Sequence, residues 1–112
     1  MDNQLEIARE IAQDFEVVTV LKGARTIIAN DKGEVYINIG DNSGMATGGS
    51  GDVLTGIICG LIAQGADNFS AAIAGVYIHS LAGDLARKVR GERGMIAGDI
   101  LLQIPQAFMN LE

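Results

Sequence analysis

A glycine-rich loop that leads into an apolar helix is the part of this sequence best suited to chemistry. Between Met45 and Gly65 the chain reads MATGGSGDVLTGIICGLIAQG, with Gly48, Gly49 and Gly51 close together in the loop. Glycines let backbone N–H groups turn toward an anion, and the start of a helix adds free N–H groups and the positive end of its dipole. These features predict a phosphate-binding site.

Asp52 lies at the junction of this loop and the helix. A carboxylate next to a bound phosphate is electrostatically unfavourable unless it takes part in a reaction. Asp52 therefore favours phosphoryl transfer over passive phosphate binding. The alternative is a plain strand-to-helix turn in which Asp52 is an ordinary helix cap. The glycine loop alone does not decide between these interpretations.

Composition narrows the class of protein. The chain has 112 residues, 48% of them hydrophobic, and a formal net charge of −6, which fits one small folded domain without the basic surface that nucleic acids require. Its single cysteine, Cys59, forms no internal disulfide, and the N-terminus lacks the apolar stretch of a signal peptide. The apolar run Val53–Ala63 is too short to cross a bilayer. We therefore expect a cytoplasmic protein without membrane partners, and 111–112 is interpreted as a possible cloning remnant.

The first half of the chain is predicted to hold one helix and three strands. The first strand is a continuous apolar run, expected to be buried on both faces, and the third alternates in a way that indicates one wetter face. Turn residues separate the second and third strands. The predicted helix is Asn3–Asp14, and the predicted strands are Val17–Leu21, Thr26–Ala29 and Glu34–Ile39.

Three helices are predicted after the glycine loop. In the first, from Val53, we expect Gly56 and Gly60 to permit close approach of another element. The second, Phe69–Arg90, is apolar nearly all round and is expected to be buried, ending at Gly91. The third begins near Gly98 with Asp99 as its N-cap, and Pro105 should kink or interrupt it.

The predicted α/β domain is unbalanced. About three strands cannot cover the apolar faces of four helices, so the chain either oligomerises or is one part of a larger protein. We favour the second interpretation.

Four segments, in order and spacing, resemble the NAD(P)H-hydrate dehydratase branch of the ribokinase-like superfamily. They are Val20–Ile28, Ala46–Leu54, Ala71–Leu85 and Gly94–Ile100. Ser50 and Gly98 replace residues that are commoner in that branch, and neither change removes a backbone donor. Because complete members are much longer, the resemblance implies that residues 1–112 form a single, partial nucleotide-binding domain, the C-terminal portion of a ribokinase-like three-layer fold.

The resemblance also implies an activity, in which hydrated NADH or NADPH is dehydrated with ADP or ATP as co-substrate. Asp52 would meet the substrate hydroxyl and act as the base, and any Mg²⁺ would arrive with the nucleotide phosphates. A homo-oligomer is expected from the surplus of apolar helix surface. The residues implied in nucleotide binding are Lys22, Gly23, Ala24, Arg25, Thr26, Asn42, Thr47, Gly48, Gly49, Ser50 and Gly51.

Two other functions remain open at this point. One is a small-molecule kinase of the same superfamily, acting on a vitamin precursor or a sugar hydroxyl. The other is a non-catalytic nucleotide-binding or oligomerisation module. Outside the loops, His79 is interpreted as a hydrogen-bonded core histidine and Cys59 as a small core residue, and no His/Cys/Asp cluster has metal-ligand spacing.

Overall fold

The computed structural model describes residues 2–22, 25–39, 50–91 and 96–109 of the chain. The elements of that part follow in the order predicted from the sequence. They are α1 (Asp2–Phe15), β1 (Thr19–Leu21), β2 (Arg25–Ala29), β3 (Val35–Ile39), α2 (Ser50–Ala63), α3 (Asn68–Arg90) and α4 (Ala97–Met109).

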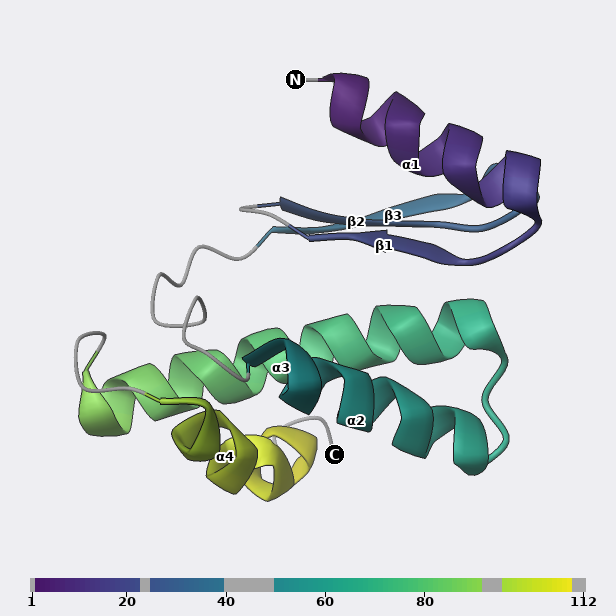
Figure 1. Cartoon of the computed structure of the whole chain (residues 1–112). Coiled ribbons are helices and arrows are strands. Elements are labelled where there is room, and N and C mark those ends of the chain that lie inside the picture. The colour runs from purple at the N-terminus through teal and green to yellow at the C-terminus, as the bar shows by residue number, and fades with distance from the viewer. Residues whose placement is uncertain (1, 23–24, 40–49, 92–95, 110–112) are drawn as a thin grey trace.

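The strands form an antiparallel sheet in the order β1-β2-β3, with Thr19 opposite Ala29 and Arg25 opposite Ile39. Figure 1 shows α1 on one face of this sheet and the helices α2 and α3 on the other, with α4 beyond them. The architecture is therefore a layered α/β arrangement, which confirms the predicted fold class. Helix α3 lies between the sheet and α4, so it is the central helix of the molecule.

Alternating side chains of β2 connect the layers. Ile27 and Ala29 point toward α1 and pack with Ala8 and Ala12, whereas Ile28 points the other way, into a cluster with residues of α2 and α3. Ile28 is fully buried, and burying a side chain of this size contributes about 1.5–3 kcal/mol to the free energy of unfolding. A separate cluster, centred on Ile78, joins α2, α3 and α4.

The turn between β2 and β3 is fixed by its own side chains. The Oδ1 atom of Asn30 accepts hydrogen bonds from the backbone N–H of Lys32 (3.1 Å) and of Glu34 (2.9 Å). Gly33 supplies the positive φ of 85° that closes the turn. This local bonding sets the register of the hairpin, and it leads the chain from β2 into β3.

The first strand is shorter and less buried than predicted. The chain leaves α1 through a left-handed residue, Glu16 (φ 54°), and the N–H of Val17 donates to the carbonyl of Ala12 (3.0 Å), so residues 16–18 belong to the connection. β1 is half-buried because only one strand pairs with it. The prediction of burial on both faces is therefore wrong for this chain.

The third strand has no wetter face along most of its length. Val35 and Ile37 pack toward α1, and Tyr36 packs into the cluster on the opposite face, beside Ile28. The prediction failed because helices cover both faces of the sheet, and a tyrosine ring can be packed while its hydroxyl reaches a polar surface.

Close approach between helices occurs at a glycine other than those predicted. A Cβ on Gly75 of α3 would lie 2.5 Å from the Cγ1 atom of Ile58, so only glycine fits this contact with α2. A Cβ on Gly56 or Gly60 would meet nothing within 4 Å. The same face of α2 also exposes Cys59, which corrects the expectation of a buried thiol. Periodicity identified the helix but did not show which arc its neighbours cover.

Helix α4 begins slightly before its predicted start. Asp99 is not the N-cap; it lies in the first turn, where its Oδ2 atom accepts a hydrogen bond from the N–H of Ile96 (2.9 Å), in the manner of the acidic member of a capping box. Its Oδ1 atom pairs with Arg90 Nε (3.2 Å) and so links the ends of α3 and α4. The helix also continues through Pro105, which is exposed, rather than being interrupted there.

Helix α3 ends as predicted, at Gly91, whose φ is 77° and whose N–H donates to the carbonyl of Arg87. Its burial is only partial, since Tyr77 and Val89 are exposed. By length and composition alone α3 could cross a membrane, but half of its most apolar window is buried inside the molecule. Its packing against the sheet, α2 and α4 is that of an internal helix.

Candidate functional site

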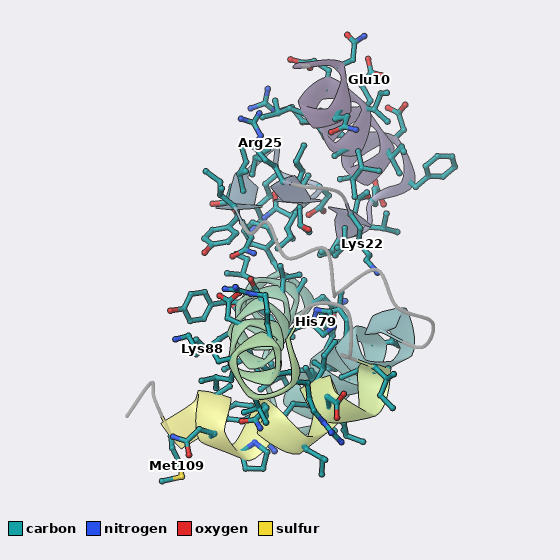
Figure 2. The ribbon with its side chains drawn as sticks, turned by 90° about the vertical axis from the view of Figure 1, so that its left-hand side faces the viewer. Glu10, Lys22, Arg25, His79, Lys88 and Met109 are labelled. Carbon is teal, nitrogen blue, oxygen red and sulfur yellow. The ribbon has the colours of Figure 1, made fainter. Side chains whose placement is uncertain are left out.

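The end of β1 and the start of α2 meet in space. A Cβ built on Gly51, in the first turn of α2, would lie 3.4 Å from the Nζ atom of Lys22. Figure 2 shows the Lys22 side chain extending from the sheet toward the start of α2. The structure therefore brings together members of the two segments that sequence analysis assigns to nucleotide binding.

This arrangement concentrates positive potential. The first N–H groups of α2 lack helical acceptors, and the N-terminal end of a helix carries about half a positive charge. The Lys22 ammonium adds a full positive charge beside them. A lysine at a helix N-terminus is unfavourable by itself, because its charge opposes the dipole. The pair becomes favourable when an anion lies between or beside them.

The alternation of the sheet separates Arg25 from Lys22. Val20 and Ile28 face α2 and α3, so Lys22 and Thr26 lie on that same face by the two-residue period of strands. Arg25 shares the opposite face with Ile27, and Figure 2 shows it directed toward the α1 side. Of the predicted residues around the first turn of the sheet, Lys22 is thus the cation placed beside α2, and Arg25 is not.

The remaining predicted residues differ in what the structure describes. Ser50 and Asp52 lie in the first turn of α2, so the backbone of Asp52 starts this helix as expected. The carbonyl of Gly51 accepts a hydrogen bond from the Thr55 hydroxyl (3.0 Å), which closes that turn. Six predicted residues lie outside the described residues: Gly23, Ala24, Asn42, Thr47, Gly48 and Gly49.

Two hollows elsewhere differ from this site in chemistry. A groove of about 490 Å³ between α2 and α4 is lined almost wholly by apolar residues, among them Ile57, Leu101 and Phe108. A polar hollow of about 530 Å³ lies between the β2–β3 turn and the start of α3. The polar groups of the second hollow bond to one another, since Asn30 bonds within its turn and Asp67 caps α3. The polar hollow brings Lys32 near the start of α3, but the carboxylate of Asp67 already caps that helix.

Metal binding finds little support in the side chains. Across residues 2–22, 25–39, 50–91 and 96–109, no group of three or more His, Cys, Asp or Glu side chains could hold a metal ion. Any divalent cation would have to share its coordination with a bound ligand and water, as Mg²⁺ commonly does with nucleotide phosphates.

The predicted core histidine is buried, but the sequence did not show that it lies near the site. His79 of α3 is 6% exposed, and Figure 2 shows it on the side of α3 that faces α2, below Lys22. The sequence contains a signal for this placement, because His79 follows Gly75 by four residues and so shares its helix face. Periodicity alone did not show that this face meets α2.

The structure is a layered α/β arrangement in which a lysine lies beside a helix N-terminus, a combination that suits an anion. A family model described as NAD(P)H-hydrate dehydratase matches residues 1–106. The chain therefore belongs to the NAD(P)H-hydrate dehydratase family, which confirms the resemblance noted from its motifs.

Individual relatives agree with this assignment. The chain is 53% identical over 111 residues to the bifunctional NAD(P)H-hydrate repair enzyme Nnr of Moorella thermoacetica. It is 45% identical over 93 residues to the ADP-dependent (S)-NAD(P)H-hydrate dehydratase of Neisseria meningitidis serogroup B. These alignments cover 99% and 82% of this chain, but only 21% and 31% of the relatives. The chain thus spans less than a third of the length of either protein.

A solved structure supports the fold in detail. The ADP/ATP-dependent NAD(P)H-hydrate dehydratase of Bacillus subtilis, co-crystallised with ATP and Mg²⁺, matches 99% of this chain with a TM-score of 0.92 and 31% sequence identity. The match covers 40% of the B. subtilis chain. The three strands and four helices described above therefore correspond to a continuous part of a larger dehydratase fold, as the unbalanced ratio of strands to helices predicted.

Proposed function

We propose that this chain supplies the nucleotide-binding and proton-accepting part of an ADP- or ATP-dependent NAD(P)H-hydrate dehydratase. In this proposal residues 1–112 act as one domain, the C-terminal portion of the fold. The reaction restores NADH or NADPH from a form in which the nicotinamide ring has been hydrated. Because the relatives are much longer than this chain, the activity is proposed for the domain in the context of such a protein.

The proposed roles follow from the positions of the residues. Lys22 and the first N–H groups of α2, including that of Gly51, would bind the nucleotide phosphates, with Ser50 and the glycine loop wrapping around them. Asp52 would accept the proton of the substrate hydroxyl as its oxygen attacks the terminal phosphorus. Phosphate would then leave with the former hydroxyl oxygen, while the neighbouring ring carbon loses a proton and the ring double bond forms again. Such a transfer depends mainly on position and on stabilisation of charge, which a fixed helix start can provide.

The residues of the site could bind the nucleotide phosphates directly, whereas a metal ion would be bound mainly through the nucleotide. The positive potential of Lys22 and the α2 N-terminus suits a di- or triphosphate, which supports ADP or ATP as co-substrate. Mg²⁺ would lie between phosphate oxygens and water rather than in a cage of protein ligands, in keeping with the side chains available.

The single observation that carries the proposal is the approach of Lys22 to Gly51. These residues come from separate segments that resemble the family's nucleotide loop and its catalytic loop, and they meet at the start of a helix. Without a ligand, an ammonium group beside the positive end of a helix dipole is electrostatically unfavourable. A bound phosphate would make the arrangement favourable.

Calorimetric titration of the 112-residue chain with ADP, with AMP as the control, tests this proposal directly. We expect saturable ADP binding and weaker AMP binding, because AMP lacks the phosphate that would reach Lys22. An assay with hydrated NADH then separates the candidate reactions. Restored NADH together with free phosphate indicates dehydration, whereas a stable phosphorylated product would indicate a small-molecule kinase and would contradict the proposed reaction.

The proposal also includes assembly through an exposed apolar surface of α4 and a cytoplasmic location. Leu101, Leu102 and Met109 of α4 are 56%, 75% and 62% exposed, which supports assembly with further copies of the protein or with the remainder of a longer one. Light scattering of the chain distinguishes a monomer from a defined oligomer. The exposed thiol of Cys59 suits a reducing compartment, so the cytoplasm remains the proposed location.

A further inference from the structure

His79 of α3 is a buried histidine near the first turns of α2, the helix whose start belongs to the proposed site. His79 is 6% exposed, although it belongs to neither of the apolar clusters that surround α3. Its imidazole is engaged in an interaction within the structure. A polar ring buried between helices is normally held by specific partners, because an unsatisfied buried polar group is costly.

The packing of α2 on α3 sets the level at which this ring lies. Gly75 of α3 contacts Ile58 of α2, and the two helices run in opposite directions (Figure 1). Moving along α3 by four residues, one helical turn, leads from Gly75 to His79 on the same face. The corresponding turn of α2 leads back from Ile58 to Leu54. This geometry places His79 near the first turns of α2, the helix that begins at Ser50 and includes Asp52.

The chemistry of the ring suits this place. A neutral imidazole can donate a hydrogen bond from one nitrogen and accept one at the other, whereas leucine or valine at the same position could only fill space. The first turn of a helix is also the part most prone to fray, because its N–H groups lack helical partners. A buried ring at that level can hold the turn in one position relative to α3.

We propose that His79 is a positioning residue for the reaction, which fixes the first turn of α2, and with it Asp52, against the central helix α3. This inference rests on the function proposed above and extends it to a residue that touches neither nucleotide nor substrate. Gly75 has a complementary role, since its missing side chain lets α2 approach closely enough for His79 to reach it.

The test compares three variants of the 112-residue chain. His79→Leu removes the polar ring and keeps an apolar side chain, and His79→Gln keeps a donor and an acceptor. Ile27→Ala is the control for lost core packing, because Ile27 is a buried residue of β2 that packs toward α1, away from α2. Hydrogen exchange of the backbone amides of Val53, Leu54 and Thr55 reports on the first turns of α2 without any substrate.

We expect His79→Leu to speed exchange at these amides about tenfold while changing the melting temperature less than Ile27→Ala does. In the hydrated-NADH assay kcat should fall about tenfold to a hundredfold with little change in KM, since a misplaced base slows the chemical step. His79→Gln should recover part of both losses. The inference is overturned if His79→Leu exchanges and turns over like the unaltered chain, or if Ile27→Ala has the same effects.

Because the exchange measurement needs no ligand, it separates this inference from the proposed function. Unchanged exchange at the start of α2 in His79→Leu overturns the positioning role even if the chain is an active dehydratase. Faster exchange confined to these amides supports the role even if the 112-residue chain binds no ADP, an outcome that would count against the proposed function alone.

Discussion

The two ends of the sheet are built on opposite electrostatic principles. At the β2–β3 turn, Asn30 satisfies backbone N–H groups through its own side chain, and nearby Asp67 does the same for the start of α3. At the other end, the Lys22 ammonium lies against the start of α2. The first end is complete in itself. The second end places a cation beside helix N–H groups that lack helical acceptors, and we propose it as the functional end.

The same contrast distinguishes two helix N-termini that lie on one side of the sheet. Helix α3 begins at an aspartate that caps it: Asp67 Oδ1 accepts from the N–H of Ser70 at 2.9 Å. Helix α2 begins at Ser50, and the Lys22 ammonium lies beside its first turn. An N-cap carboxylate stabilises the fold whether or not a ligand is bound, whereas a lysine beside a helix N-terminus lowers the stability of the ligand-free protein. Substitutions at the start of α3 should therefore lower stability, and substitutions at the start of α2 should weaken ligand binding.

The largest effect is expected from Asp52→Asn at the functional end. Asparagine keeps the size of the side chain and loses its ability to take a proton, so kcat should fall by about 10²–10⁴, the usual contribution of a general base. ADP affinity, measured by calorimetry, should stay nearly unchanged, because the backbone donors and Lys22 remain in place.

The assay for Asp52→Asn measures restored NADH in whichever protein is active, the 112-residue chain or a longer form that contains it. Turnover retained within a factor of two of the unaltered protein would show that another group accepts the proton. Loss of ADP binding together with turnover would instead assign Asp52 to the architecture of the site.

The next largest effect is expected from Lys22→Met, which removes the ammonium and keeps most of the stem. A hydrogen bond to a charged group contributes about 1.5–3 kcal/mol, so ADP affinity should fall about tenfold or more. The melting temperature without ligand should stay the same or rise, because the repulsion between Lys22 and the α2 dipole is removed.

Lys32→Met is the control for Lys22→Met. Lys32 is an exposed lysine at the opposite end of the sheet, in the β2–β3 turn, so its loss should leave ADP affinity unchanged. Equal losses of affinity in the two variants would mean that general attraction, rather than a specific phosphate contact, holds the nucleotide.

The structural end should respond to Asn30→Ala with lost stability and unchanged binding. Alanine leaves the N–H groups of Lys32 and Glu34 without their acceptor, a loss of about 1–3 kcal/mol in the free energy of unfolding. Urea denaturation measures this loss, and calorimetry at a temperature where the variant is folded measures ADP affinity. Weaker ADP binding in the folded variant would show that the two ends of the sheet are coupled, contrary to the comparison above.

Much of the fold was predictable because its signals are local. The helical periods of residues 3–14 and 69–90 identify α1 and α3, and the turn residues Asn30–Gly33 identify the hairpin. The glycine loop likewise placed the start of α2 near Gly51. Each of these features depends on residues close together in the chain, so no knowledge of the packing is required.

The features that the sequence did not reveal depend on contacts between distant segments. Periodicity does not say which arc of a helix meets its neighbour, so Gly75 rather than Gly56 or Gly60 makes the close contact, and Cys59 is exposed. Nor does it show that Lys22 reaches Gly51 while Arg25 faces away. At the site, residue types were predictable and the separation of the two cations was not.

The smallest effect is expected at the N-cap of α3, where the effect of a substitution on the melting temperature should depend on pH. Hydrogen bonds from the Ser70 backbone and side chain lower the pKa of Asp67 below its ordinary value of 3.8. A carboxylate whose pKa is lower in the folded state stabilises the protein above its unfolded pKa, and this contribution is lost as the pH falls through the folded pKa. Asp67→Ala should therefore lower the melting temperature slightly at pH 7 and leave it unchanged relative to the parent at a pH below the folded pKa. ADP affinity should not change at either pH, because Asp67 belongs to the end of the molecule that is complete without a ligand. A difference in melting temperature that persists at the lowest pH would assign the effect to lost packing or to the neutral hydrogen bonds rather than to the charge.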